Sequence, residues 1–206
     1  MYKLFQMQDS GNCYKVRLLL SHLNLPCEMI ETNIINGESR TEAFLKKNAN
    51  GKTPTFEIND TTYLAESTAI LYYLAVGTNY FPTDNKLHQA QILQWMSFEQ
   101  YSHEPYIATS RFWISLLKQP AMYAKQILDK KPGGYVALDV MEAHLSRHHF
   151  FVNETYSIAD IALYAYTHVA NEGGFDLSLY PSINRWLQRV ADQAGHISII
   201  EPYNNG

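Results

Sequence analysis

The sequence predicts an α/β domain followed by an all-helical domain. Up to residue 78, short strand-like segments alternate with helical patterns, whereas every strong signal after residue 85 is helical. Between these regions, residues 79–85 are polar and contain Pro82 and Asp84, a composition typical of a linker between compact units. We therefore expect one domain at residues 1–78, a linker at 79–85 and a second domain at 86–206.

The first domain has the predicted order β-α-β-α-β-β-α. Its expected elements are a strand at Tyr2–Met7, a helix at Cys13–Leu23, a strand at Cys27–Thr32, a short helix at Thr41–Lys47, strands at Thr55–Ile58 and Thr62–Leu64, and a helix at Ser67–Ala75. Only a tight connection around Asn59 and Asp60 separates the last two strands, so they must form an antiparallel hairpin.

The second domain contains four predicted helical regions. A long, aromatic-rich region covers Lys86–Leu117 and should bend at Pro105, and a second at Ala121–Arg147 should be interrupted at Pro132–Gly134. A third region at Ser157–Ala170 begins with Ser157-Ile-Ala-Asp160, which resembles a capping box with Asp in place of Glu. A helix at Pro181–Ala191 ends the predicted bundle.

The composition excludes several classes of function. The chain has 206 residues, 46% of them hydrophobic, and a formal net charge of -4 without a block of like charge, which argues against a nucleic-acid partner. No apolar run approaches the roughly 20 residues of a membrane span, and no signal-peptide pattern opens the sequence. Cys13 and Cys27 lack metal-site spacing, as do His103, His148 and His149. We expect a cytoplasmic protein without a metal or membrane partner.

Ser10-Gly-Asn12-Cys13 lies at the predicted junction between the first strand and the first helix. The start of a helix presents unpaired N–H groups and the positive end of the helix dipole, which stabilise an anion such as a thiolate. A serine hydroxyl at this place can also donate a hydrogen bond to sulfur. The alternative is that Ser10 or Asn12 only caps the helix.

Two further segments have the residue types of a binding site for a peptide-like ligand. A cis bond before Pro54 would leave the N–H and C=O of Thr53 free to pair with an extended peptide, whereas a trans proline would simply begin an edge strand. At the start of the next helix, Ser67 and the adjacent N–H groups suit a carboxylate, and Glu66 can accept from an ammonium group. The alternative for Ser67 is an ordinary helix cap.

The order of these motifs on a β-α-β-α-β-β-α framework resembles the cytosolic glutathione transferase family over essentially the whole chain. The matching segments are Ser-Gly-Asn-Cys-Tyr-Lys-Val-Arg at 10–17, Asn-Gly-Lys-Thr-Pro-Thr at 50–55, Ala-Glu-Ser-Thr-Ala-Ile at 65–70 and Ser-Ile-Ala-Asp at 157–160. The resemblance is to Ser-type classes such as theta and phi, or a related bacterial class. It implies a thioredoxin-like first domain, a helical second domain, glutathione as co-substrate, and a homodimer with a contact along the long helix from Lys86.

The resemblance also assigns roles to residues of this chain. It implies that the Ser10 hydroxyl stabilises the glutathione thiolate, with Asn12 as a second contributor near the sulfur. Thr53, before a cis Pro54, would pair with the cysteinyl unit. The remaining implied contacts are Glu66 and Ser67 with the γ-glutamyl group and Lys52 with a glutathione carboxylate.

Some positions depart from the family pattern. Ala49 stands where the family usually has proline, and Thr53 where it usually has valine, but only backbone geometry is needed at Thr53. The segment Ile35–Arg40 matches poorly, so we carry over no contact from it, although Arg40 is a candidate partner for the glycyl carboxylate.

The expected reaction is conjugation of the thiolate to a small apolar electrophile, as in detoxification. The electrophile should bind between the domains, and Tyr101, Tyr106 and Phe112 are the candidate residues, although such aromatic spacing also occurs in helix cores. One alternative is a thiol-disulfide exchanger, because Ser10 and Cys13 have the spacing of a Cys-x-x-Cys motif with the first cysteine replaced. A non-catalytic binding module of the same fold is another, and glutathione-dependent isomerisation or dehalogenation also remains open.

Overall fold

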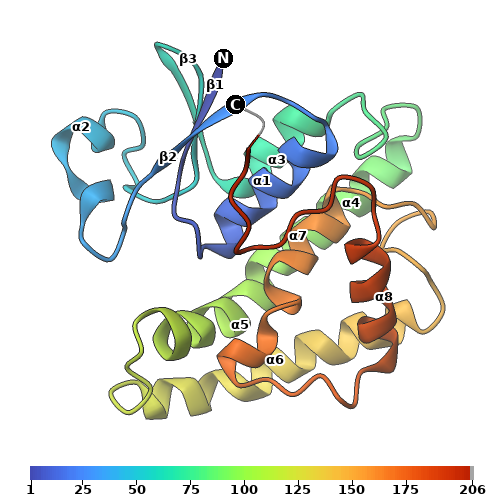
Figure 1. The fold of residues 1–206 in the computed structure, drawn as a ribbon. Coiled ribbons are helices and arrows are strands. Elements are labelled where there is room, and N and C mark those ends of the chain that lie inside the picture. Colours follow the sequence, from blue (N-terminus) through green and yellow to red (C-terminus); the bar gives the residue numbers. More distant parts are fainter. Residues whose placement is uncertain (205–206) are drawn as a thin grey trace. The chain divides into compact units, whose positions relative to one another are not determined.

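The structure is a computed structural model that describes residues 1–204. The chain forms two compact units. Residues Met1–Val76 make up the first unit together with the segment that begins at Ala194, and Gly77–Gln193 make up the second. Figure 1 shows the path of the chain through its strands and helices. Within the described residues, no helix is long and apolar enough to cross a membrane.

The first unit contains a four-stranded mixed sheet in the order β2-β1-β3-β4. Its strands are β1 (Tyr2–Gln6), β2 (Cys27–Glu31), β3 (Thr55–Asn59) and β4 (Thr62–Ala65). β1 pairs in parallel with β2 and antiparallel with β3, and β3 and β4 form the expected antiparallel hairpin. This is the thioredoxin-like arrangement that the sequence predicts.

The helices of the first unit cover both sides of this sheet. They are α1 (Gly11–His22), the 3-10 turn η1 (Glu38–Arg40), α2 (Glu42–Leu45) and α3 (Ser67–Ala75). α1 and α3 pack against each other on one side of the strands, and α2 lies on the other side (Figure 1). Phe44 of α2 meets Phe5 of β1 edge-to-face, with ring centroids 6.0 Å apart. The packing of α1 on α3 brings the beginnings of both helices close to one another.

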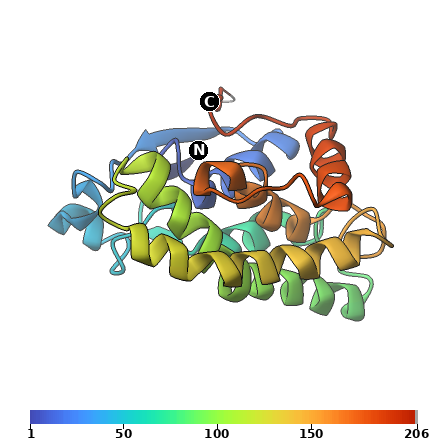
Figure 2. The ribbon, with the colours of Figure 1, turned by 90° about the horizontal axis from the view of Figure 1, so that it is seen from below.

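The second unit is helical. Its elements are α4 (Lys86–Phe98), the π-helical turn η2 (Glu99–His103), α5 (Glu104–Arg111), the π-helical turn η3 (Phe112–Leu116), α6 (Ala124–Leu145), α7 (Ile158–Thr167), the 3-10 turn η4 (Ala170–Gly173) and α8 (Pro181–Ala191). Figure 2 shows α6 as a long helix that runs beside α4 and α5. Every residue of α7 is buried, so this helix forms the centre of the unit.

Two details of the helical unit differ from the sequence prediction. The prediction of a break at Pro132 is wrong, because α6 continues through this residue. Tyr106 and Phe175 pack their rings where a Cβ at Gly133 and Gly134 would lie, so the glycines allow close packing that stabilises the uninterrupted helix. At Pro105, where a bend was expected, a new helix begins: the π-helical turn η2 ends at His103, and Pro105 lies in the first turn of α5, where proline is tolerated.

The boundaries of the two units differ from the expected domain limits around the linker and at the C-terminus. In the second unit, Phe81 is buried and the carbonyl of Tyr80 accepts a hydrogen bond from the N–H of Ile158 at 3.1 Å, so residues 79–85 include anchored positions. The segment from Ala194 packs on the first unit, because the buried Arg17 of α1 donates to the carbonyl of Ile199 at 2.9 Å. Residues 205 and 206 of the expected second domain lie outside the described residues.

Candidate functional site

Ser10 is the N-cap of α1, as one of the two readings of the sequence expects. Its backbone is extended, with φ -76° and ψ 122°, and its Oγ accepts from the N–H of Cys13 at 3.4 Å. The hydroxyl acts as an acceptor in this bond, so its own proton remains available for another partner. The half-buried Ser10 can therefore cap the helix and donate to a ligand at the same time.

Cys13 lies within the first turn of α1 and is fully buried. Its Sγ accepts from the N–H of Met7 at 3.4 Å. Burial raises the pKa of the Cys13 thiol, and the nearby polar groups of Ser10, Met7 and Thr53 oppose this effect only in part. A buried thiol with a raised pKa is poorly suited to attack a disulfide, which needs an accessible thiolate.

The loop before β3 holds Thr53 and Pro54 in a defined conformation. The Thr53–Pro54 peptide bond is cis, as the resemblance implies. Asn48 braces the loop, because its Nδ2 donates to the carbonyl of Lys52 at 2.9 Å and to Oγ1 of Thr55 at 3.0 Å. Among residues 1–204, no hydrogen bond reaches the backbone N–H or C=O of Thr53. These two groups are therefore available to an extended peptide ligand.

Gly51 is required by the same loop. Its φ of +60° lies in the left-handed region, and a Cβ at this position would lie 2.9 Å from the carbonyl oxygen of Ser39. Arg40, the candidate partner for the glycyl carboxylate, is exposed and donates to the carbonyl of Asn50 at 3.0 Å. Lys52 is exposed as well, which leaves its ammonium group accessible to an anion.

Glu66 and Ser67 lie at the beginning of α3. Glu66 has a positive φ of 68° and is exposed, and Nδ2 of Asn50 donates to its carboxylate at 3.4 Å. Ser67 is the first residue of the helix and is buried. Its Oγ donates to Oδ1 of Asn12 at 3.1 Å. The structure thus joins two sequence-predicted residues, Asn12 and Ser67, that come from different helices.

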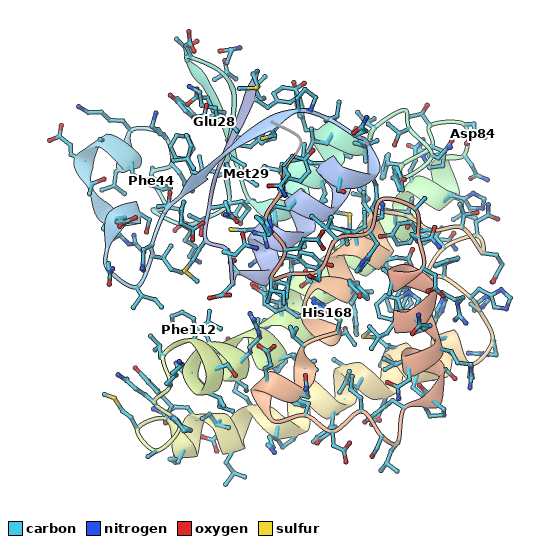
Figure 3. The ribbon with its side chains drawn as sticks, in the orientation of Figure 1. Glu28, Met29, Phe44, Asp84, Phe112 and His168 are labelled. Carbon is cyan, nitrogen blue, oxygen red and sulfur yellow. The ribbon has the colours of Figure 1, made fainter. Side chains whose placement is uncertain are left out.

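The three aromatic candidates for the electrophile site all lie in the second unit. Tyr101, in the π-helical turn η2, is 84% exposed. The ring of Tyr106 packs on Gly133 of α6, and the ammonium group of Lys130 lies 5.3 Å from the ring centroid. Phe112 is half-buried at the start of the π-helical turn η3 (Figure 3). Because the Tyr106 ring packs on Gly133, part of its surface is used in packing within the helical unit.

Two residues of this region were missed by the sequence analysis. Lys15 is fully buried in α1, and its Nζ donates to Oδ1 of Asn12 at 2.7 Å. The spacing of three residues places Lys15 and Asn12 on one face of the helix, a signal that was available in the sequence. The sequence does not identify Asn48 as a site residue, because its hydrogen-bond partners depend on the path of the loop, which no local pattern encodes.

The two units match two domain models of one protein family. Residues 4–77 match the glutathione S-transferase N-terminal domain, and residues 95–194 match the glutathione S-transferase C-terminal domain. A glutathione S-transferase structure from Pseudomonas fluorescens is 51% identical, with a TM-score of 0.94, and the match covers 97% of this chain and 99% of that one. This chain belongs to the glutathione S-transferase family. It is therefore a member of an enzyme family with a thioredoxin-like first domain and a helical second domain.

Other relatives show how widely this family fold is used. The structure of a possible glutathione S-transferase from Rhodopseudomonas palustris is 47% identical, with a TM-score of 0.95, and the match covers 98% of each chain. Elongation factor 1-gamma from Artemia salina is 31% identical over 93% of this chain, which spans only 44% of that protein. The disulfide-bond oxidoreductase YfcG of Escherichia coli is 25% identical over 87% of this chain and 85% of that protein.

Proposed function

We propose that this protein binds glutathione on its first unit, stabilises the thiolate and conjugates it to a small apolar electrophile. The observation that carries the proposal is the hydrogen bond between Ser67 and Asn12. It places the N-terminal ends of α1 and α3 together, and both ends offer unpaired N–H groups to an anionic ligand. The Ser10 hydroxyl at one end and Ser67 at the other then face separate parts of the same tripeptide.

Each part of glutathione has a matching group in this proposal. The Ser10 proton would be donated to the sulfur, and the free N–H and C=O of Thr53 would pair with the backbone of the cysteinyl unit. Glu66 and Ser67 would hold the γ-glutamyl group. Lys52 would pair with a carboxylate, because its ammonium is exposed.

The chemical effect is a larger fraction of thiolate at neutral pH. A cysteine thiol ordinarily has a pKa of about 8.5, and a hydrogen bond donated to the anion lowers that value. Ser10 would act by stabilising the anion and not as a nucleophile itself. An electrophile held near the sulfur would then react in an effectively intramolecular step. We keep Tyr101, Tyr106 and Phe112 as the proposed residues of the electrophile site.

A second candidate function is glutathione-dependent disulfide exchange. The likeness to YfcG, which is named as a disulfide-bond oxidoreductase, favours it. The burial of Cys13 means that glutathione, and not a protein thiol, would have to attack the disulfide. The reaction would be thiolate attack on one sulfur with release of the other as a thiol.

Calorimetric titration with glutathione, followed by a substrate screen, tests both candidates. The screen should include a chloronitroaromatic, an epoxide, an isothiocyanate and a mixed disulfide. We expect binding of glutathione and turnover of at least one of the first three compounds. Turnover of the disulfide alone would favour the second candidate, and an absence of glutathione binding would reject both.

A further inference from the structure

The C-terminal segment, residues 194–204, runs alongside α1 in the direction opposite to the helix (Figure 1). Near the end of α1, the hydroxyl of Ser21 donates to the carbonyl of Gly195 at 2.7 Å. About two turns earlier in the helix, the hydroxyl of Tyr14 donates to the carbonyl of Ile197, also at 2.7 Å. The segment therefore approaches the beginning of α1 and the loop between β1 and α1.

Gln8 joins this loop to the C-terminal segment. Its Nε2 donates to the carbonyl of Ile199 at 2.8 Å and to that of Glu201 at 3.1 Å. Both partners are acceptors only, so the side-chain atom that faces them must be the amide nitrogen, which gives one N–H to each. Ser10 caps α1 only two residues after Gln8. The contact with the segment thus lies next to the hydroxyl that we propose as the thiolate donor.

Arg17 of α1 joins the same two pieces of chain at a second point. Its Nη2 donates to the carbonyls of Gln8 and Ile199, each at 2.9 Å. Arg17 is fully buried, and hydrogen bonds from a buried cation hold their partners firmly. From β2, the carboxylate of Glu31 accepts from the N–H of Gln8 at 2.9 Å. The backbone of Gln8 is therefore fixed by α1 and β2, and its side chain by the C-terminal segment.

We propose that the C-terminal segment is part of the thiolate site, with Gln8 as the positioning residue through which it holds the Ser10 hydroxyl toward the glutathione sulfur. This inference rests on the proposed function, because it concerns how Ser10 is placed. A hydrogen bond weakens steeply when its distance or angle departs from the preferred geometry. A loop that loses one of its attachments samples more conformations, so Ser10 donates to the sulfur for a smaller part of the time.

This role differs from that of a segment that only stabilises the fold. Loss of a purely stabilising contact lowers the free energy of unfolding but leaves the folded site as it was. Loss of a positioning contact changes the bound thiol in the folded protein. Ser21 provides the matched comparison, because its bond to Gly195 joins the same segment to α1 at the end far from the loop.

The test compares Gln8→Met with Ser21→Ala, each of which removes side-chain donation to the C-terminal segment. Methionine keeps the length of the half-buried Gln8 side chain but has no N–H. In Gln8→Met, ultraviolet titration should show that the pKa of the bound thiol rises by about half a unit, which lowers conjugation about threefold at a pH below that pKa. The kcat should fall with little change in the KM for glutathione, and Ser21→Ala should keep the wild-type values.

A double-mutant cycle with Ser10 shows whether Gln8 acts through that residue. Because the proposal gives Gln8 no contact with the sulfur, Gln8→Met should raise the thiol pKa no further when Ser10→Ala is already present. Additive shifts would overturn the proposal, as would an unchanged thiol pKa in folded Gln8→Met. An equal shift in Ser21→Ala would overturn it too, since the segment would then act through α1 as a whole and not through the loop.

A shortened chain that ends at Ser198 tests the same contact from the other side. It removes the acceptors at residues 199 and 201 but keeps the contacts of Ser21 and Tyr14 with the segment. We expect the thiol pKa to rise at least as much as in Gln8→Met, and a wild-type value would contradict the proposal even if Gln8→Met fails to fold. A wild type that binds no glutathione would reject the proposed function itself, which is a distinct result.

Discussion

At the scale of single residues, Ser10 shows how one hydroxyl group can serve both structure and chemistry. Its oxygen accepts from the N–H of Cys13, which satisfies one free donor of the first turn of α1. Its proton is not used in that bond and can be donated to an anion. The cap and the proposed contact with sulfur therefore do not compete with each other.

We predict that Ser10→Ala leaves glutathione bound but raises the pKa of its thiol. Conjugation at pH 7 should fall roughly tenfold or more, since one pKa unit corresponds to about 1.4 kcal/mol. The difference from the wild type should shrink as the pH rises, because the thiolate then forms without help. Ultraviolet titration and pH-rate profiles measure both effects.

Cys13→Ala is the matched control for this prediction. Because Cys13 is buried and its pKa is raised, its removal should leave the pH-rate profile unchanged. The opposite pattern, with Ser10→Ala silent and Cys13→Ala inactive, would favour exchange through the protein thiol.

At the scale of elements, the N-terminus of α7 is held by more than the capping box that the sequence predicts. Asp160 is fully buried and accepts from the N–H of Ser157 and from its hydroxyl, at 3.0 and 3.1 Å. It also accepts from the N–H of Phe151 at 3.2 Å and from the indole of Trp186 at 3.0 Å. The same carboxylate thus connects α7, the segment before it and α8. Burial raises the pKa of Asp160 to about 6.

We predict that Asp160→Ala lowers the free energy of unfolding by about 3 kcal/mol. A lost capping residue alone costs roughly 0.5–2 kcal/mol. The additional cost arises because the buried donors of Phe151 and Trp186 would lose their partner. Denaturant unfolding measures the effect, and a loss below about 0.5 kcal/mol would contradict the role of this network.

A second element, the β1–β3 pair, carries a charged contact that should make stability depend on pH. Lys3 and Glu57 lie opposite one another, with Nζ and Oε1 2.7 Å apart, and Lys47 lies 3.8 Å from the other carboxylate oxygen. The hydrogen bond from Lys3 holds the pKa of Glu57 below its usual 4.5. A lowered pKa in the folded state means that the stabilisation is present above pH 4.5 and is lost as the pH falls through the folded value.

We predict that Glu57→Gln lowers the melting temperature at pH 7 and that the difference from the wild type narrows as the pH approaches 3. Thermal unfolding across this range tests the prediction. Glu42→Gln is a matched control, because Glu42 pairs with Lys46 on the surface, where both side chains are more than 70% exposed. Such exposed pairs contribute little, so this control should follow the wild type at every pH.

At the scale of the whole molecule, the segment from Ala194 returns to the first unit, and we expect this contact to stabilise that unit. The segment from Ala194 binds along α1, where the hydroxyl of Tyr14 donates to the carbonyl of Ile197 at 2.7 Å. The buried Arg17 donates to the carbonyls of Ile199 and Gln8, each at 2.9 Å, and also to the Gln6 side chain. Burial lowers the pKa of Arg17, and these acceptors help to compensate the cost of burying its charge.

We predict that deletion of the chain from Ala194 destabilises the first unit by at least about 2 kcal/mol, since buried donors of Arg17 would lose their acceptors. Tyr14→Phe removes a single donor and should cost only about 1 kcal/mol. Unfolding followed by hydrogen exchange on α1 measures both. Equal stability of the full and shortened chains would show that the segment is not needed for the fold.

We also predict a homodimer with a contact along α4, as the family resemblance implies. Leu93 is 44% exposed on this helix, which is consistent with a position that is covered in an assembly. Light scattering at micromolar concentration should give twice the chain mass of 23.7 kDa. Leu93→Asp should shift the mass toward that of one chain, whereas Leu179→Asp, at an exposed loop position, should not.

The sequence by itself determined the features that depend on neighbouring residues. The order of elements, the β3–β4 hairpin and the helix caps at Ser10 and Ser157 follow from periodicity and from contacts within a few positions. The motifs around Ser10, Thr53 and Ser67 also identified the family, because their residue types and order are specific as a set.

Only the tertiary structure decided the features that join distant parts of the chain. The bond between Asn12 and Ser67 and the contact of Arg17 with Ile199 depend on how loops return the chain, and no local pattern encodes that path. The continuity of α6 through Pro132 has the same origin. A proline weakens a helix locally, but the packing of Tyr106 and Phe175 on the adjacent glycines outweighs that cost, and this packing exists only in the folded protein.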